Sequence, residues 1–202
     1  VRFTVWLNEK FDNIKKVAES TTKHGKLLEI KSYLIGRYVF VRFSFDTADA
    51  MGMNMVTIAV DRATRFIEQK TGAKCIAISS NMCSDKKPSY INIFEGRGTY
   101  VVAEAIVKEK NLKELLKTDA KNVEEVAKIK NLLGSSLSGT THYNAHFANI
   151  IAAIFIATGQ DVAQVVESSS GFSIVESEGK NIRISVTLPS LEVGAVGGGT
   201  AY

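Results

Sequence analysis

The apolar residues at the start of the chain follow first a two-residue and then a helical spacing. Val1–Leu7 alternates between apolar and polar side chains and is rich in aromatic residues, which predicts a strand. Asn8 can then cap a helix whose apolar positions Phe11, Ile14 and Val17 recur every three residues. The chain therefore begins with a predicted strand followed by a predicted helix.

The next residues complete an alternating pattern of strands and helices. Lys26–Ile35 and Tyr38–Phe45 are strand-like runs joined by Gly36-Arg37, which predicts a hairpin. Asp49 can cap a second amphipathic helix, which ends at Gly72, and Lys74–Ser79 predicts a short buried strand. The predicted order β-α-β-β-α-β is the ferredoxin-like arrangement, and we assign it to a small domain of residues 1–79.

Residues 80–202 have a different pattern, which predicts part of a larger α+β domain. Its predicted helices are Asn111–Thr118, Asn122–Leu133 and Tyr143–Thr158. Its predicted strands are Thr99–Val107, Phe172–Glu176 and Ile182–Leu188, the last of which ends at Pro189. The helix Tyr143–Thr158 is apolar on nearly all sides, so we expect it to be a buried central helix.

Composition and charge fit a globular chain. Of the 202 residues, 45% are apolar and 23% charged, which excludes a disordered chain or a coiled coil. The net charge of +4 permits a phosphate-bearing ligand without requiring one. Cys75 and Cys83 are too few and too poorly partnered for a zinc site, so we expect reduced thiols, no metal and a cytoplasmic location.

The two ends of the sequence are consistent with a segment of a longer protein. The chain begins at Val1 rather than at methionine and ends on a glycine-rich run that follows a strand-like stretch. The most apolar stretch, Ile150–Ala157, is too short to span a bilayer, so we expect no membrane contact from this segment.

One segment has the chemistry of a phosphate site. Asp49–Met55 has the sequence Asp-Ala-Met-Gly-Met-Asn-Met and lies where a strand gives way to a helix. The start of a helix offers backbone N–H groups and a positive dipole end, and Gly52 lets a ligand approach the backbone closely. The simpler alternative is a capped helix whose methionines lie in the core.

That heptad and three other motifs resemble the class I branch of the 3-hydroxy-3-methylglutaryl-coenzyme A (HMG-CoA) reductase family. The motifs occur in the family's order and span most of the chain. They are Asp49–Met55; Asp85-Lys86-Lys87-Pro88 with Glu95-Gly96-Arg97-Gly98; Tyr143-Asn144-Ala145-His146 with Gly159–Gln164; and Leu188–Gly194 with Gly197-Gly198-Gly199-Thr200.

The resemblance implies an enzyme that reduces HMG-CoA to mevalonate and coenzyme A by two hydride transfers from NADPH. It implies that residues 1–79 bind the cofactor and that residues 80–202 belong to the large substrate-binding domain. It also implies a homodimer or higher homo-oligomer with active sites between subunits. A catalytic glutamate and a substrate-binding arginine would precede residue 1, and a histidine that protonates coenzyme A would follow residue 202.

By the same resemblance, Lys86 is the catalytic lysine and Asp161 its partner. Reduction of a thioester places negative charge on oxygen, which a fixed ammonium stabilises. A carboxylate beside that ammonium favours the charged form of both groups. The simpler interpretations are a solvated lysine and an aspartate at a helix C-terminus, where the dipole disfavours it.

The resemblance also implies two sets of binding residues. Those for the cofactor are Thr22, Lys23, His24, Asp49, Met51, Gly52, Met53, Asn54 and Met55, with Lys23 at the position that contacts the 2′-phosphate. Those for the substrate are Ser79, Asn81, Asp85, Lys87, Lys130 and Asn149. His146 is expected to be structural, and a non-proline cis peptide is expected between Cys83 and Ser84.

Two other functions remain open at this point. The chain can be a non-catalytic homologue, because the flanking catalytic groups lie outside it. It can also be a ferredoxin-like RNA-binding module, with Tyr38 and Phe40 on one face of a strand to stack on bases. This second alternative leaves residues 81–202 without a role, so we expect no nucleic-acid partner.

Overall fold

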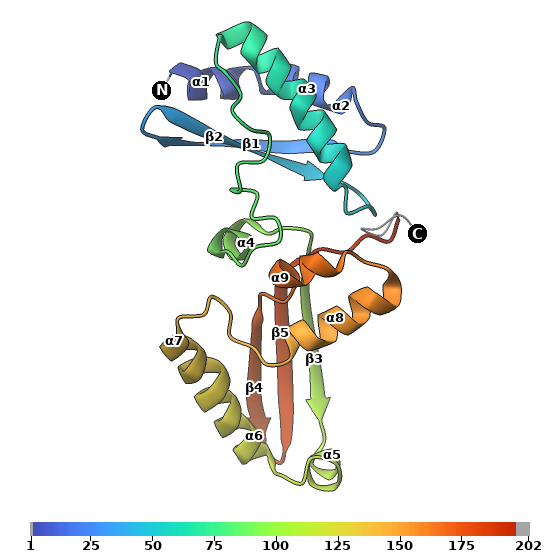
Figure 1. Cartoon of the computed structure of the whole chain (residues 1–202). Helices are drawn as coiled ribbons and strands as arrows, with labels where there is room; N and C mark the ends of the chain where they lie inside the picture. Colours follow the sequence, from blue (N-terminus) through green and yellow to red (C-terminus); the bar gives the residue numbers. More distant parts are fainter. Residues whose placement is uncertain (1, 197–202) are drawn as a thin grey trace. The chain divides into compact units, whose positions relative to one another are not determined.

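The structure, a computed structural model, describes residues 2–196, which form two compact units (Figure 1). The first unit contains residues 2–83 together with residues 194–196, and the second contains residues 84–193. The division follows Cys83, a short distance past the expected boundary at residue 79. The chain is a mixture of helices and antiparallel strands, as expected for an α+β protein.

The first unit is a β-hairpin with helices packed on one face (Figure 1). Its elements are α1 (Arg2–Glu9), α2 (Phe11–Glu19), β1 (Lys26–Ile35), β2 (Tyr38–Asp46) and α3 (Met53–Thr71). The predicted hairpin is confirmed: Ile35 pairs with Tyr38 across a turn in which Gly36 has a φ of +58°. Gly72 ends α3 in the left-handed conformation, also as predicted.

Two strands predicted for this unit are wrong. Residues 2–9 form a helix, because Phe3, Trp6 and Leu7 face one core at helical spacing and Leu7 is completely buried there. Lys74–Ser79 is no strand either; Ile76 is 76% exposed, and the N–H of Cys75 donates to the Glu68 side chain at 2.6 Å. Within the described residues this unit therefore has a two-stranded sheet, not the four strands of a ferredoxin-like domain.

The core of the first unit joins its helices to the inner face of the hairpin. Its fully buried members are Leu7, Ile14, Ala18, Leu27, Ala59 and Ala63. Val41, Phe43 and Phe45 alternate along β2 and turn toward this cluster. The small residues on α3 allow α2 to approach closely, so the start of α3 is placed by packing along the rest of the helix.

The second unit is built on the antiparallel sheet β3-β5-β4. Its strands are β3 (Thr99–Val107), β4 (Phe172–Glu178) and β5 (Asn181–Leu191). Its helices are α4 (Tyr90–Glu95), α5 (Glu109–Glu114), α6 (Ala120–Val126), the π-helical η1 (Ala127–Gly134), α7 (Ser135–Ser138), α8 (Phe147–Thr158), the 3₁₀ turn η2 (Val162–Gln164) and α9 (Val165–Ser168). The predicted strand Thr99–Val107 and the predicted β4–β5 hairpin are confirmed.

Helices cover one face of this sheet, and every second side chain of β5 points toward these helices. Ile182 and Ile184 pack with α5 and α6, and Val186 and Leu188 pack with α8. Pro189 was predicted to end the strand but lies within β5, fully buried. The register between β3 and β5 shifts between Thr99 and Val101, opposite the proline, so the missing N–H falls where the ladder is already irregular.

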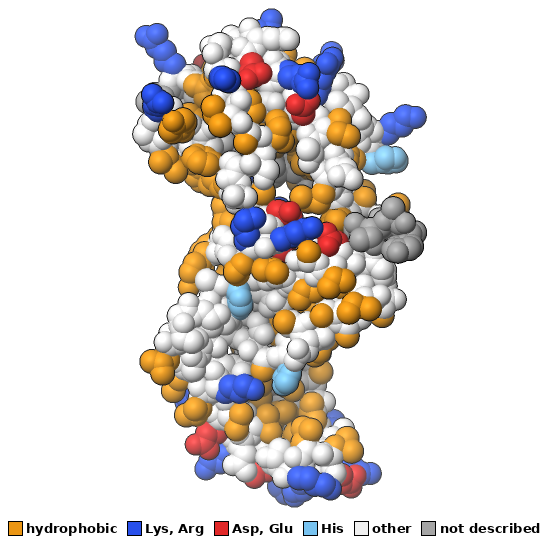
Figure 2. Space-filling view, in the orientation of Figure 1, with side chains coloured by type: hydrophobic (Ala, Val, Ile, Leu, Met, Phe, Trp, Pro, Cys, Tyr) orange, Lys and Arg blue, Asp and Glu red, His pale blue; other side chains and the backbone are white. Residues whose placement is uncertain are grey.

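The central helix α8 is buried on one side only, contrary to the expectation of full burial. Phe147, Ile151 and Phe155 pack on the sheet, whereas Ile150 is 57% and Ile156 69% exposed. Figure 2 shows apolar side chains gathered over this helix. Among residues 2–196, no helix has both the length and the apolar character needed to cross a bilayer.

Candidate functional site

Lys86 and Asp161, 75 positions apart in the chain, form an ion pair in the second unit. The Lys86 Nζ lies 2.9 Å from the Asp161 Oδ2. Asp161 is the N-cap of η2 and accepts a hydrogen bond from the Ala163 N–H at 3.0 Å. The interpretation of Asp161 as a residue at the C-terminus of a helix is therefore wrong. Its carboxylate lies at the favourable, positive end of the following turn.

The environment of Lys86 favours its charged form. The hydrogen bond to Asp161 raises the pKa of the Lys86 ammonium above its usual value, and the nearby carboxylates of Asp85 and Glu167 act in the same direction. The Lys86 side chain is 43% exposed and can meet a ligand. The site thus presents a protonated lysine that is held by an aspartate and remains accessible.

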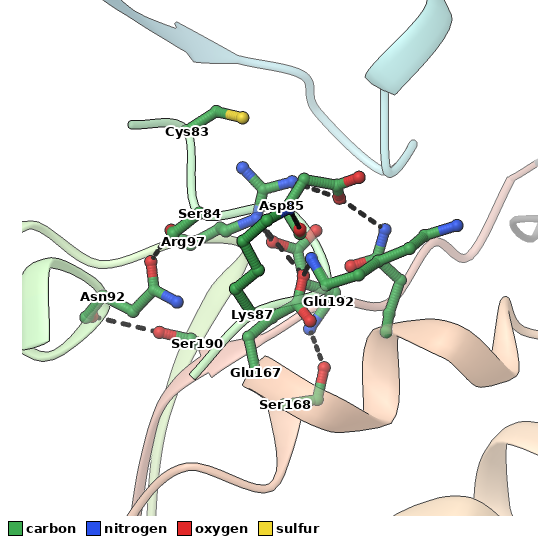
Figure 3. Close-up of polar contacts among 12 residues, drawn as sticks. Cys83, Ser84, Asp85, Lys87, Asn92, Arg97, Glu167, Ser168, Ser190 and Glu192 are labelled. Atoms are coloured by element: carbon green, nitrogen blue, oxygen red, sulfur yellow. Dashed lines mark hydrogen bonds and ion pairs between the residues drawn. The ribbon is translucent and has the colours of Figure 1, made fainter. Parts of the chain in front are cut away.

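In the same unit, a largely buried arginine is shared by three carboxylates (Figure 3). The Arg97 guanidinium lies 2.8 Å from Asp85, 3.5 Å from Glu167 and 2.5 Å from Glu192. Glu167 is completely buried and Glu192 is 3% exposed. We call Arg97, Asp85, Glu167 and Glu192 the arginine cluster. No role was expected for Arg97, Glu167 or Glu192, because nothing in their spacing shows that charged residues meet in the interior.

Negative charge exceeds positive charge in the arginine cluster, and burial makes the excess costly. Burial raises the pKa of Glu192 to about 7, an effect that Arg97 opposes. Burial also raises the pKa of Glu167, although the hydrogen bond from the Lys86 backbone opposes this shift. Glu192 is therefore the carboxyl of the cluster that takes up a proton near neutral pH.

We expect the second unit to lose stability as the pH rises toward neutrality. The pKa of folded Glu192, about 7, lies above its ordinary value of 4.5. Protonation of Glu192 therefore stabilises the folded state. This contribution is fully present below pH 4.5 and is lost as the pH rises through 7. This shift corresponds to about 3 kcal/mol. In urea unfolding followed by circular dichroism, Glu192→Gln is expected to flatten this decline. The control Glu176→Gln, at an exposed position, should leave the decline of stability with pH unchanged. If the free energy of unfolding falls equally with pH in Glu192→Gln and in wild type, Glu192 is not the group responsible.

The loop that carries Lys86 is also fixed by a hydrogen bond to α4, and α4 is in turn hydrogen-bonded to β5. The Ser84 hydroxyl donates to the Asn92 side chain, and the Ser190 hydroxyl donates to the Asn92 carbonyl at 3.0 Å. The expected cis peptide between Cys83 and Ser84 is wrong, because all peptide bonds among residues 2–196 are trans. The turn is made instead by positive φ angles, +57° at Ser84 and +56° at Lys86.

The residues expected to bind substrate are dispersed. Asp85 belongs to the arginine cluster and also accepts from the Gln164 amide at 3.0 Å. Lys87 is exposed and donates to the Asp85 carbonyl at 2.8 Å. Lys130 is exposed on η1, and exposed Asn149 bonds the Nδ1 of His146 at 3.1 Å. In the described part of the chain, neither Lys130 nor Asn149 is joined to Lys86 by a hydrogen bond or an ion pair.

The two remaining expected substrate residues belong to the first unit. Ser79 lies 3.4 Å from Cys83, measured from hydroxyl oxygen to sulfur, and Asn81 has a φ of +62°. His146, expected to be structural, lies just before α8 as its N-cap with a φ of +67°.

In the first unit, the two segments expected to bind the cofactor meet. The Thr22 hydroxyl lies 2.9 Å from the Met55 sulfur and accepts from the N–H groups of His24 and Gly25. Lys23 and His24 are exposed beside this contact. Residues 33 positions apart thus form one surface at the start of α3.

The heptad Asp49–Met55 is held by the returning end of the chain. Asp49 was expected to cap α3, and this prediction is wrong. Its carbonyl accepts hydrogen bonds from the N–H groups of Ala195 and Val196, at 2.8 and 3.1 Å. The N-cap is Gly52, and no side chain caps the helix there. A 19-residue helix that begins without a capping side chain fits a dinucleotide phosphate. The terminal glycines at 197–199 lie outside the described residues.

Metal chemistry has no comparable candidate. Across residues 2–196, no cluster of His, Cys, Asp and Glu side chains is arranged to hold an ion. The arginine cluster gathers three carboxylates, but its centre is occupied by the Arg97 guanidinium.

Known proteins resemble this chain along its whole length. A relative from Aeropyrum pernix named 3-hydroxy-3-methylglutaryl-coenzyme A reductase is 56% identical over 98% of this chain and 48% of its own length. The one from Methanocaldococcus jannaschii is 51% identical over 96% of this chain and 50% of its own length. The chain therefore spans about half the length of these curated relatives.

The fold resembles that of a solved structure. A solved structure titled as the class II 3-hydroxy-3-methylglutaryl-CoA reductase from Streptococcus pneumoniae bound to NADPH in open conformations matches 97% of this chain and 55% of its own. The TM-score is 0.64 at 18% identity, so the likeness concerns the fold. A family model described as hydroxymethylglutaryl-coenzyme A reductase matches residues 1–202. The chain belongs to the hydroxymethylglutaryl-coenzyme A reductase family.

Proposed function

We propose that this chain carries the lysine–aspartate pair and the cofactor segment of an enzyme that reduces HMG-CoA to mevalonate and coenzyme A. The observation that carries the proposal is the 2.9 Å pair of Lys86 and Asp161 in a member of this family. NADPH is the reductant, and each of two NADPH molecules supplies one hydride. Two protons complete the balance, giving the alcohol, free coenzyme A and oxidised cofactor.

Lys86 would act on the thioester oxygen. As hydride reaches the carbonyl carbon, negative charge develops on that oxygen, and an ammonium already fixed nearby stabilises it without rearranging. Asp161 keeps the lysine charged and directs its Nζ. The pair performs electrostatic work that the chain supplies itself, whereas the glutamate, arginine and histidine of the family pattern would come from sequence beyond this chain.

The surface at the start of α3 would bind NADPH. The start of α3 is suited to the pyrophosphate, because no side chain caps the helix at Gly52. Thr22, Lys23 and His24 lie beside it, supporting contact with the 2′-phosphate. The other expected residues, Asp49, Met51 and Met55, frame this surface.

We expect Lys23→Ala to separate the two nicotinamide cofactors. Its exposed ammonium is suited to the 2′-phosphate that NADPH has and NADH lacks. In steady-state kinetics with the full-length protein, KM for NADPH should rise by about tenfold, while KM for NADH changes little. Lys26→Ala, a second exposed lysine at the start of β1, is the matched control. An equal rise for both cofactors would assign Lys23 a general rather than a phosphate-specific role.

In the second unit, Lys87, Lys130 and Asn149 would contact the substrate. For Ser79 and Asn81 of the first unit, a substrate role stays a prediction from the resemblance. Exposed Lys87 is suited to a carboxylate of the hydroxymethylglutaryl group. Asp85 is committed to Arg97 and Gln164, so its role would be to shape the loop rather than to hold the substrate directly.

Three further features extend the proposal. The hairpin with α2 and α3 would be the middle of a ferredoxin-like arrangement whose outer strands come from sequence beyond this chain, because a two-stranded sheet is marginal alone. The exposed side of α8 favours burial in a homodimer or higher homo-oligomer with shared active sites. Two free cysteines favour a cytoplasmic location.

The direct test uses the full-length gene product. HMG-CoA-dependent oxidation of NADPH, followed by absorbance, is expected, with mevalonate and free coenzyme A as products. The free thiol of coenzyme A should appear in half the molar amount of NADPH consumed, because two hydrides are used per turnover. An intact, folded full-length protein that oxidises no NADPH with HMG-CoA would favour the non-catalytic homologue.

A further inference from the structure

The backbone at Lys86 has a conformation that lysine disfavours. Its φ of +56° lies in the left-handed region, which L-residues other than glycine rarely adopt. Such a conformation persists when neighbouring groups impose it. The Lys86 N–H donates to the Glu167 Oε1 at 2.9 Å, and Glu167 is completely buried in α9. A buried carboxylate therefore holds the main chain of the residue to which catalysis is assigned.

One short segment contacts the Lys86 loop at three points. Asp161 binds the Lys86 side chain, Gln164 binds the Asp85 carboxylate, and Glu167 binds the Lys86 backbone. These residues, the N-cap of η2, the last residue of η2 and a residue of α9, are three apart. This spacing places side chains on one side of a tight helical stretch. The segment therefore holds both the side-chain ammonium and the backbone N–H of Lys86.

The charge of Glu167 is balanced from the opposite side by Arg97. The Arg97 Nε lies 3.5 Å from the Glu167 Oε1, the same oxygen that accepts from the Lys86 N–H. A buried carboxylate needs both a hydrogen bond and a counter-charge to remain in the interior. Lys86 supplies the first and Arg97 the second. In Figure 3, Glu167 lies among the labelled members of the arginine cluster, below the loop.

We propose that Glu167 is a positioning residue for the reaction: its carboxylate fixes the backbone of Lys86 so that the ammonium meets Asp161. The proposal rests on the proposed function, because it requires Lys86 to act on the substrate. Glu167 itself is completely buried, so its role would be indirect, through the backbone of Lys86. Arg97 acts one step further away, as the counter-ion that keeps Glu167 in place.

Two variants of the full-length enzyme separate positioning from charge. Glu167→Gln keeps an oxygen that can accept from Lys86, and its amide nitrogen replaces Oε2, which has no hydrogen-bond partner among the described residues. Glu167→Ala removes the acceptor. We expect Glu167→Ala to lower kcat by about ten- to a hundredfold with little change in KM for NADPH, since small displacements of a catalytic group have effects of that size. Glu167→Gln should recover most of the lost rate.

Glu192→Gln is the matched control. Glu192 is another buried carboxylate on Arg97, and its ion pair with Arg97 is shorter, 2.5 Å. Among the described residues, no hydrogen bond or ion pair joins it to Lys86. Its effect on kcat should be clearly smaller than that of Glu167→Ala. If Glu192→Gln and Glu167→Ala lower kcat equally, the arginine cluster acts as a whole and the specific role of Glu167 is overturned.

Hydrogen exchange at the Lys86 amide gives a readout that does not depend on activity. Exchange should be slow in wild type and in Glu167→Gln, and should accelerate by about tenfold or more in Glu167→Ala, because the amide loses its acceptor. The amides of β5 serve as the internal reference. Faster exchange in β5 as well would indicate general unfolding, and the Glu167→Gln comparison would then decide.

The outcomes distinguish this proposal from the proposed function. If wild type does not reduce HMG-CoA but Lys86 exchange follows the expected order, the proposed function fails while the contact holds. If wild type is active and Glu167→Ala keeps a kcat near wild type, the positioning role fails alone. A Glu167→Gln variant that is as slow as Glu167→Ala would also overturn the proposal, because charge and not the hydrogen bond would then be the active feature.

Discussion

Replacing Lys86 by alanine in the full-length enzyme is expected to lower kcat by about a hundred- to a thousandfold. The ammonium lies 2.9 Å from Asp161, which raises its pKa, so it is charged throughout the neutral range. Its stabilisation of the thioester oxygen is needed only as charge develops there. The binding of NADPH, which we assign to the first unit, should therefore be little changed in equilibrium titrations.

Two other variants make the result specific. Lys86→Arg keeps the charge but replaces a compact ammonium with a planar fork, so it should fall between wild type and Lys86→Ala. Lys180→Ala removes an exposed lysine from the β4–β5 turn of the same unit and should have no effect on kcat. A Lys86→Ala enzyme that keeps more than about a tenth of the wild-type kcat would remove the lysine from the electrostatic role.

The parts of the fold that the sequence predicted well depend on local backbone chemistry. Gly36 and Gly72 supply left-handed conformations where a hairpin turns and where a helix ends. The turn between β4 and β5 likewise needs Gly179, which has a φ of +63°. Each of these signals is complete within a few residues, so neither distant packing nor the rest of the protein changes it.

The predictions that were wrong concern segments whose structure depends on distant parts of the chain. The sequence Val1–Leu7 satisfies a two-residue alternation and also a helical spacing. Only the burial of Leu7 in one cluster with Ile14 and Ala18 decides between them. Pro189 continues a strand because the register of β3 shifts opposite it. In both cases the deciding partner lies elsewhere in the chain, so the local pattern did not contain the answer.

In the candidate site, too, some residues could be found from the sequence and others could not. Lys86 and Asp161 could be paired from a resemblance, because the motifs name them. Glu167 and Glu192 are charged residues in the interior, and what makes them tolerable is Arg97, about 70 to 95 positions away. No spacing rule predicts such a meeting. The residues that support a catalytic side chain are therefore harder to find from sequence than the side chain itself.

Gly52→Ala is expected to be the most destabilising single change in the cofactor segment. Gly52 has a φ of +78°, and a Cβ there would lie 2.4 Å from the Thr47 Cγ2. The left-handed backbone costs a non-glycine residue about 1 to 2 kcal/mol. Overpacking adds about 1 to 3 kcal/mol. The free energy of unfolding should therefore fall by about 4 kcal/mol, near the sum of both effects, and the start of α3 should shift so that NADPH binding is lost.

Gly72→Ala is the matched control at the other end of α3. Gly72 has nearly the same φ, +71°, but no atom lies within 4 Å of the position that a Cβ would take. It should therefore show the backbone effect alone, about 1 to 2 kcal/mol, and keep NADPH binding. Urea unfolding of the 202-residue chain can be followed by the fluorescence of Trp6, its single tryptophan, which packs against the core of the first unit. Equal losses for the two variants would mean that Thr47 yields to the added methyl group. The glycine in the heptad would then serve the turn, and the close contact with Thr47 would have no part in shaping the cofactor surface.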